Sequence, residues 1–161
     1  MPYTGIAAMD LDAFNQFPDL PETHVLDNRI YTNQEIFEQE QKKVFKHTWL
    51  FVCHESELPK AGSFRTTLAG GKPIIIVRGK DGLIRSFYNI CRHRSSPVVR
   101  SDSGNAKEFQ CFYHLWTYNL EGACTGVTKP DGYKAVNLDK NKLGLIPIRA
   151  DVIAGLVFVC L

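Results

Sequence analysis

The sequence predicts a small, mostly antiparallel β domain with one α-helix near its N-terminus. The clearest helical periodicity lies in residues 31–47. From residue 49 onward, short runs rich in Val, Ile, Phe and Tyr alternate with turns that contain Gly or Pro. The chain has 161 residues, of which 44% are hydrophobic and 22% charged, which is enough for one domain with a real core.

Residues 1–28 have no strong periodicity, and Pro18 and Pro21 interrupt any long element. This stretch has no Lys or Arg and no continuous apolar block, so it does not have the pattern of a secretory signal. We interpret residues 1–30 as an N-terminal arm. Two alternatives stay open for it: a disordered leader, or an arm that packs on a neighbouring subunit.

The helix is expected over Tyr31–His47. Thr32 and Glu35 have the spacing of a capping box, which predicts Thr32 as the N-cap. Lysines in the last turns of this helix are placed favourably, because their positive charges lie at the negative, carboxyl end of the helix dipole. The apolar face is expected to contain Ile36, Phe37, Val44 and Phe45.

Strands are expected wherever short apolar or alternating runs lie between turn residues. The continuous run Ile74–Val77 is typical of a strand buried on both faces. Several glycines and Pro130 mark residues 122–132 as a long loop. The predicted strands are Trp49–Cys53, Phe64–Leu68, Lys72–Arg78, Leu83–Tyr88, Phe109–Cys111, Thr117–Leu120, Leu145–Arg149 and Leu156–Leu161.

The charge and cysteine content exclude several classes of protein. A net charge of +2 is too small to indicate a nucleic-acid partner or an anionic membrane, and no apolar run has the length of a membrane span. The five cysteines lack the spacing of a disulfide framework. We therefore expect a reducing compartment, the cytoplasm.

Two short runs predict a metal centre. Cys91–His93 has the form C-x-H, and Cys111–His114 has the form C-x-x-H. A zinc finger usually groups its cysteines in one knuckle and its histidines in another, whereas each run here holds one of each. Mixed pairs suit a cluster in which one iron takes both cysteines and the other both histidines, the ligation of a Rieske [2Fe–2S] centre. The alternative is a structural zinc site.

The sequence around these two runs also follows a known pattern, and the match covers most of the chain. The matching stretches are Glu35–Phe45, Thr48–Leu50, Glu57–Gly62, Tyr88–Arg94, Gly104–Lys107 and Cys111–Asn119. From about Tyr31 to Leu161 the chain resembles the N-terminal Rieske domain of the alpha (large) subunit of aromatic-ring-hydroxylating oxygenases, in the benzoate/salicylate-type group. Three positions depart from the family pattern. Ser95 and Leu115 stand where the family has Gly, and Phe112 stands where it has Pro.

The resemblance implies a Rieske-type antiparallel β-sandwich or barrel with a cluster-binding subdomain over residues 31–161. Its [2Fe–2S] ligands would be Cys91, His93, Cys111 and His114. In this family, oxygen chemistry takes place at a mononuclear non-heme Fe(II) in a catalytic domain that follows. The apolar end of the chain, residues 153–161, favours the interpretation that the sequence is a fragment that stops before such a domain. We therefore expect no catalytic residue in this chain, and no oxygenase activity from it alone.

The resemblance also implies partners. A ferredoxin or a flavin reductase would supply electrons, and the full-length enzyme would contain trimeric alpha subunits, with or without beta subunits. The function implied is an electron relay in aromatic catabolism, from that donor to the mononuclear iron. The alternative is a free-standing Rieske ferredoxin, which carries electrons but has no substrate of its own.

Side chains next to the ligands are candidates for tuning the cluster through hydrogen bonds and solvent access. The basic candidates have a solvated loop as their alternative interpretation, and the aromatic ones an ordinary core. Cys53, Cys124 and Cys160 are most simply buried small residues. The candidates are Arg92, Arg94, Ser95, Tyr113, Trp116 and Tyr118.

Overall fold

A computed structural model describes residues 29–136 and 138–161 of the chain. The chain forms two compact units with their boundary between Glu38 and Gln39. The predicted arm, residues 1–30, lies almost wholly outside the described residues and stays a prediction. No helix in the described part of the chain is long and apolar enough to cross a membrane.

The predicted helix is present but divided. α1 covers Arg29–Thr32, α2 covers Gln34–Glu40, and a π-helical turn, η2, covers Gln41–Phe45. Thr32 was the wrong choice of cap for α2. The Oδ1 atom of Asn33 accepts hydrogen bonds from the backbone N–H groups of Glu35, at 2.8 Å, and Ile36, at 3.1 Å. Asn33 is the cap because its short side chain reaches the two N–H groups that the first turn leaves unpaired.

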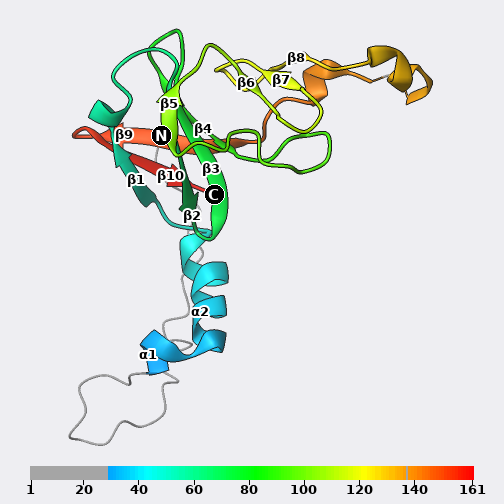
Figure 1. Cartoon of the computed structure of the whole chain (residues 1–161). Helices are drawn as coiled ribbons and strands as arrows, with labels where there is room; N and C mark the ends of the chain where they lie inside the picture. The colour runs from blue at the N-terminus through cyan, green and yellow to red at the C-terminus, as the bar shows by residue number, and fades with distance from the viewer. Residues whose placement is uncertain (1–28, 137) are drawn as a thin grey trace, which may run out of the picture. The chain divides into compact units, whose positions relative to one another are not determined.

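Most of the domain is one antiparallel sheet of seven strands, and it confirms the predicted fold class (Figure 1). Six of the strands correspond to predicted ones, whereas the short edge strand β5 was not predicted. Their spatial order is β1 (Leu50–His54), β10 (Leu156–Cys160), β9 (Pro147–Ile153), β4 (Ile84–Tyr88), β3 (Lys72–Arg78), β2 (Ser63–Ala69) and β5 (Ser103–Asn105).

A second, three-stranded sheet carries the other motif-bearing part of the chain. It contains β6 (Phe109–Gln110), β7 (Thr117–Tyr118) and β8 (Cys124–Gly126). The expectation of one long loop over residues 122–132 was wrong, because β8 and the start of the 3₁₀ helix η4 (Pro130–Val136) lie there. Two shorter 3₁₀ turns are η3 (Glu55–Glu57) and η5 (Lys140–Lys142).

Strand β3 separates two hydrophobic cores, which explains its unbroken apolar run. Ile75 and Val77 belong to the first core, and Ile74 and Ile76 belong to the second. All four side chains are fully buried. Alternate residues of a strand point to opposite faces, so a strand between two cores needs apolar residues at every position.

The two cores contain different parts of the domain. The second core contains Cys53, Leu58, Ala69, Ile74, Ile76, Ile148, Val157 and Val159. The first core contains Phe64, Ile75, Val77, Phe87, Cys91, Val98, Phe109, Cys111, Trp116, Tyr118, Leu120, Cys124 and Leu145. Both predicted cysteine ligands therefore lie in the first core, together with residues of the small sheet.

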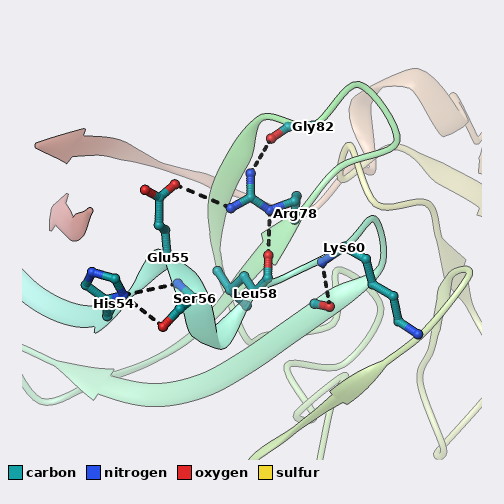
Figure 2. Close-up of polar contacts among 8 residues, drawn as sticks. His54, Glu55, Ser56, Leu58, Lys60, Arg78 and Gly82 are labelled. Carbon is teal, nitrogen blue, oxygen red and sulfur yellow. Dashed lines mark hydrogen bonds and ion pairs between the residues drawn. The ribbon is translucent and has the colours of Figure 1, made fainter. Parts of the chain in front are cut away.

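Arg78, at the end of β3, ties the η3 turn to the main sheet (Figure 2). Its guanidinium donates to the carbonyl oxygens of Leu58 and of Gly82, and it lies 3.6 Å from a carboxylate oxygen of Glu55. On the same turn, the Nδ1 atom of His54 accepts a hydrogen bond from the N–H of Ser56. His54 is thus a helix-capping residue at this edge of the domain.

Asn89 holds the loop that follows β4. Its side chain is 6% exposed. The Oδ1 atom accepts from the N–H groups of Val98 and Val99, both at 2.9 Å, and the Nδ2 atom donates to the carbonyl oxygen of Val99 at 2.7 Å. One buried amide thereby joins the two ends of the segment that carries the first metal-binding run.

We predict that Asn89→Ala lowers the free energy of unfolding by about 3 kcal/mol, because buried backbone groups lose their partners. Asn119→Ala is the matched control, since it removes one exposed turn hydrogen bond, to the N–H of Ala123, and should cost about 1 kcal/mol or less. Urea unfolding of both variants measures the difference. Equal losses for the two variants would contradict a special role for Asn89.

Candidate metal centre

The first predicted metal-binding run folds into a tight turn, the first knuckle, defined as Cys91–Ser96. The N–H of Ser95 donates to the carbonyl oxygen of Cys91 at 2.9 Å. The N–H of Cys91 donates to the carbonyl oxygen of Ser96 at 2.8 Å. These two bonds close the loop on itself and present His93 at its tip.

The second run, in the second knuckle Cys111–Trp116, closes in the same way. The N–H of Leu115 donates to the carbonyl oxygen of Cys111, and the N–H of Cys111 donates to the carbonyl oxygen of Trp116, both at 2.9 Å. The same turn is therefore built twice. The histidine stands one position later in the second knuckle, as His114.

Two of the three departures from the family pattern fall at left-handed backbone positions, one in each knuckle. Ser95 has a φ of 55° and Leu115 a φ of 59°, both in the left-handed region that favours glycine. The backbone hydrogen bonds that close each knuckle hold these two residues in the left-handed conformation. At the third departure, Phe112 is half-exposed, and the guanidinium of Arg100 lies 4.7 Å from its ring centroid.

The two predicted cysteine ligands lie side by side in the first core. Cys91 is 3% exposed and Cys111 is 1% exposed. Burial raises the pKa of the Cys111 thiol, the backbone N–H groups of Tyr113 and His114 lower it, and the hydrogen bond with Cys91 raises it again. The Cys111 thiol thus needs a nearby cation to become a thiolate.

The two predicted histidine ligands also lie against each other. The ring centroids of His93 and His114 are 4.5 Å apart, at an interplanar angle of 75°. Burial lowers the pKa of His93, and the neighbouring His114 and Arg94 lower it further. His93 is therefore held as neutral imidazole, the form that binds a metal.

The buried polar atoms of this site fit a metal group. The Nδ1 atom of His93 is buried and has no hydrogen-bond partner among the described residues, and the same holds for the Nε1 atom of Trp116. Buried polar atoms in folded proteins nearly always have partners, so an unpaired ring nitrogen that can accept an electrophile marks a ligand position. A free Nδ1 on His93 is the atom that a metal would take.

The four side chains pair by type rather than converge on one point. Within residues 29–136 and 138–161, no three His, Cys, Asp or Glu side chains are arranged to hold a single ion. Instead, thiol lies next to thiol and imidazole next to imidazole. This arrangement favours two unlike metals over one tetrahedral zinc.

Tyr118, on β7, joins that strand to the first knuckle through its hydroxyl group. The side chain is fully buried. Its oxygen accepts the N–H of Arg92 at 3.0 Å, so its own proton is free to go to the Sγ atom of Cys91, at 3.2 Å. Burial raises the pKa of Tyr118, and the bond to Cys91 raises it further. This tyrosine therefore stays protonated and donates to the sulfur.

The remaining candidates occupy different surroundings. Trp116 is 2% exposed and stacks on His93, with centroids 4.8 Å apart and planes 10° apart. Tyr113 is half-exposed, and its ring centroid lies 3.9 Å from that of His114. The side chains of Arg92, Arg94 and Ser95 are exposed at the first knuckle.

The other three cysteines are buried and free. Cys53 belongs to the second core. The Sγ atom of Cys160 accepts a hydrogen bond from Arg149 at 2.9 Å. Cys124 is in the first core, and burial raises the pKa of its thiol, with a smaller contribution from the charge of Cys91. Their exclusion as ligands stays a prediction.

Two residues that hold the site were not among the candidates. The sequence contains a signal for Asn89, because a polar residue directly after an apolar strand and two positions before a predicted ligand is expected to make structural hydrogen bonds. The sequence around Tyr133 contains no motif that would place it at the metal centre. Its hydroxyl oxygen lies 3.1 Å from the Nε2 atom of His93, a residue 40 positions away in the chain.

The folded site, with paired thiols, paired imidazoles and a hydroxyl donor to sulfur, defines an iron–sulfur electron-transfer domain. The sequence matches the family of the Rieske [2Fe-2S] domain over residues 48–138, and the chain belongs to that family.

Its relatives are alpha subunits of oxygenases, which confirms the resemblance. The chain is 42% identical to the 2-aminobenzenesulfonate 2,3-dioxygenase subunit alpha of Alcaligenes sp, over 88% of the chain and 36% of that protein. It is 39% identical to the methanesulfonate monooxygenase hydroxylase subunit alpha of Methylosulfonomonas methylovora, over 86% of the chain and 36% of that protein.

Solved structures show the same fold. A naphthalene 1,2-dioxygenase structure matches with a TM-score of 0.77 and 36% identity, over 81% of this chain and 30% of its own. The chain spans about a third of the length of the curated relatives it matches.

The left-handed residues generate a stability prediction. A non-glycine residue in this region costs roughly 1–2 kcal/mol, and part of the gain from glycine is offset by a more flexible unfolded chain. We therefore expect Ser95→Gly and Leu115→Gly each to raise the free energy of unfolding by about 0.5–1 kcal/mol. Ser96→Gly, which changes the next position, should be neutral or destabilising. Chemical unfolding of the three variants checks this, and destabilisation by the first two would contradict it.

A second prediction concerns the potential of the cluster. Tyr118→Phe removes the hydroxyl donor to Cys91, and such donors stabilise the more negative, reduced state. A factor of ten in relative stability corresponds to about 59 mV for one electron, so we expect a fall on the order of 50 mV. Voltammetry of the cluster-loaded domain measures it. An unchanged or higher potential would show that the hydroxyl does not donate to the sulfur.

Proposed function

We propose that this chain is the electron-entry domain of a ring-hydroxylating oxygenase alpha subunit. Cys91 and Cys111 would bind one iron of a [2Fe–2S] cluster, and His93 and His114 the other. The observation that carries the proposal is the pairing by type within one site, with thiol against thiol and imidazole against imidazole. The unpaired Nδ1 atom of His93 supports it.

The choice of ligands matters because it decides the charge of the site. Two thiolates offset the charge of about +2 of an oxidised cluster core, and neutral imidazoles leave the total near zero. When bound, such a cluster supplies a one-electron couple at about −150 to +300 mV, against about −400 mV for plant-type ferredoxins. The residues around it lower the pKa of His93, which favours its neutral form, and direct N–H and O–H donors at the sulfurs.

The relatives favour an alpha-subunit domain over a free-standing ferredoxin. The proteins that match over most of this chain are named as oxygenase alpha subunits, and the match covers 36% of each of them. By analogy, the mononuclear non-heme iron would lie outside these residues, and this chain alone would not hydroxylate a substrate. The relay would run from a ferredoxin or flavin reductase, through this domain, to that iron.

The substrate is a separate question. The names of the relatives include an aminobenzenesulfonate dioxygenase and a methanesulfonate monooxygenase, so an aromatic ring is not common to them all. We propose an aromatic substrate on the basis of the first of these. Membership of the benzoate/salicylate-type group, a trimeric assembly and a cytoplasmic location stay predictions.

Metal analysis tests the proposal directly. Protein prepared anaerobically should contain about two irons and two acid-labile sulfides per chain, and its reduced form should give a Rieske-type electron paramagnetic resonance spectrum. Cys91→Ser and Cys111→Ser should each abolish that spectrum.

Matched controls come from the two cysteines that lie outside the first core cluster. Cys53→Ala and Cys160→Ala should keep the full spectrum, with at most a loss of stability from the small cavities they leave. Stoichiometric zinc without sulfide in the unmodified protein would contradict the proposal. Loss of the cluster in either alanine variant would require a different ligand set.

A further inference from the structure

We propose that Tyr133 is a positioning residue that selects Nδ1 of His93 as its iron-binding atom. It does so by accepting a hydrogen bond from the opposite ring nitrogen, Nε2. The inference rests on the proposed function, because it assumes that His93 is a cluster ligand. It adds a residue from η4 to a site otherwise built by the two knuckles and Tyr118.

The contact is specific in its geometry. The Tyr133 oxygen is 3.1 Å from the Nε2 atom of His93. The two rings meet edge to face, with centroids 6.1 Å apart and planes at 85°. Tyr133 also meets the edge of Trp116, at 6.0 Å and 77°. Because the tyrosine ring packs against both neighbours, its hydroxyl has little freedom to point elsewhere.

His93 is confined on its other sides as well. Trp116 stacks on one face of the imidazole, and the His114 ring lies edge-on to it. With Nε2 bound to Tyr133, the Nδ1 atom is left buried without a partner among the described residues. A half-turn of the ring would replace Nε2 by a carbon at the hydroxyl and remove Nδ1 from its buried position. The hydroxyl therefore distinguishes the two ring orientations.

The hydrogen bond also decides which nitrogen carries the proton. A neutral imidazole has one N–H and one bare nitrogen. If the Tyr133 oxygen accepts from Nε2–H, then Nδ1 is the bare nitrogen that can bind a metal. Metal-bound histidines generally use this arrangement, in which the outer N–H donates to a fixed acceptor.

The two histidines of the site are not equivalent in this respect. In the described part of the chain, no hydrogen bond to a ring nitrogen of His114 is present, and that ring is covered by the ring of Tyr113 instead. Both tyrosines line the same cavity, of about 460 Å³, at the histidine side of the site. The cavity therefore has one tyrosine that bonds to a ligand through oxygen and one that only packs.

The bond has an electronic consequence. An acceptor on the outer N–H makes an imidazole a stronger electron donor to its metal. A stronger donor stabilises the oxidised cluster, so Tyr133 should lower the reduction potential. Removal of the hydroxyl should raise it, which is the opposite sign to the effect expected for Tyr118.

The test uses the cluster-loaded protein and two isosteric variants. Tyr133→Phe removes the proposed acceptor, and Tyr113→Phe removes a hydroxyl from the same cavity that makes no hydrogen bond to a described residue. Pulsed electron paramagnetic resonance of the reduced protein measures the coupling of the outer ring nitrogens and their exchangeable protons. Voltammetry at one pH measures the potential, and iron content checks that each variant is fully loaded.

For Tyr133→Phe we expect full iron content, a more positive potential and a changed coupling for one of the two outer nitrogens. For Tyr113→Phe we expect neither change. An unchanged or more negative potential in Tyr133→Phe, an unchanged coupling, or equal effects in both variants would overturn the inference. If the unmodified protein gives no Rieske spectrum, the proposed function itself has failed, so the two failures are distinguishable.

Discussion

The contact between two buried thiols, those of Cys91 and Cys111, is the constraint on which the rest of the site depends. Both side chains are buried, and burial raises the pKa of the Cys111 thiol. A pair of thiolates can exist here only with a positively charged partner and with donors around it. The surrounding structure supplies the donors: backbone N–H groups of the second knuckle at Cys111, and the hydroxyl of Tyr118 at Cys91.

The knuckles also show where the domain accepts local strain. Each is closed by the same two backbone hydrogen bonds, and each needs a left-handed residue to close. This chain places Ser95 and Leu115 there, without the freedom of glycine. Strained backbone of this kind persists where the surrounding structure determines the conformation, and it is found mainly at functional sites. Asn89, on one side of the first knuckle, is part of that surrounding structure.

The relatives that contain a domain like this one differ in the substrates that their names give. A sequence 42% identical to this one lies in an aminobenzenesulfonate dioxygenase, and one 39% identical lies in a methanesulfonate monooxygenase. A naphthalene dioxygenase has the same fold. A domain shared by proteins with such different substrates is suited to a step they have in common. The supply of electrons is such a step, and the proximity of thiol to thiol and imidazole to imidazole in this chain is consistent with it.

The sequence by itself determined the helix near residues 31–47, most strands and the four ligand candidates, because periodicity and spacing are local properties. From the mixed pairs it also predicted that cysteine would go with cysteine and histidine with histidine. Only the tertiary structure decided that Asn33 caps α2, that Tyr118 reaches Cys91 and that Tyr133 reaches His93. Such contacts depend on the order of strands in a sheet and on the path of loops. An alternating pattern specifies which residues face inward, but it does not specify which strand or loop lies opposite them.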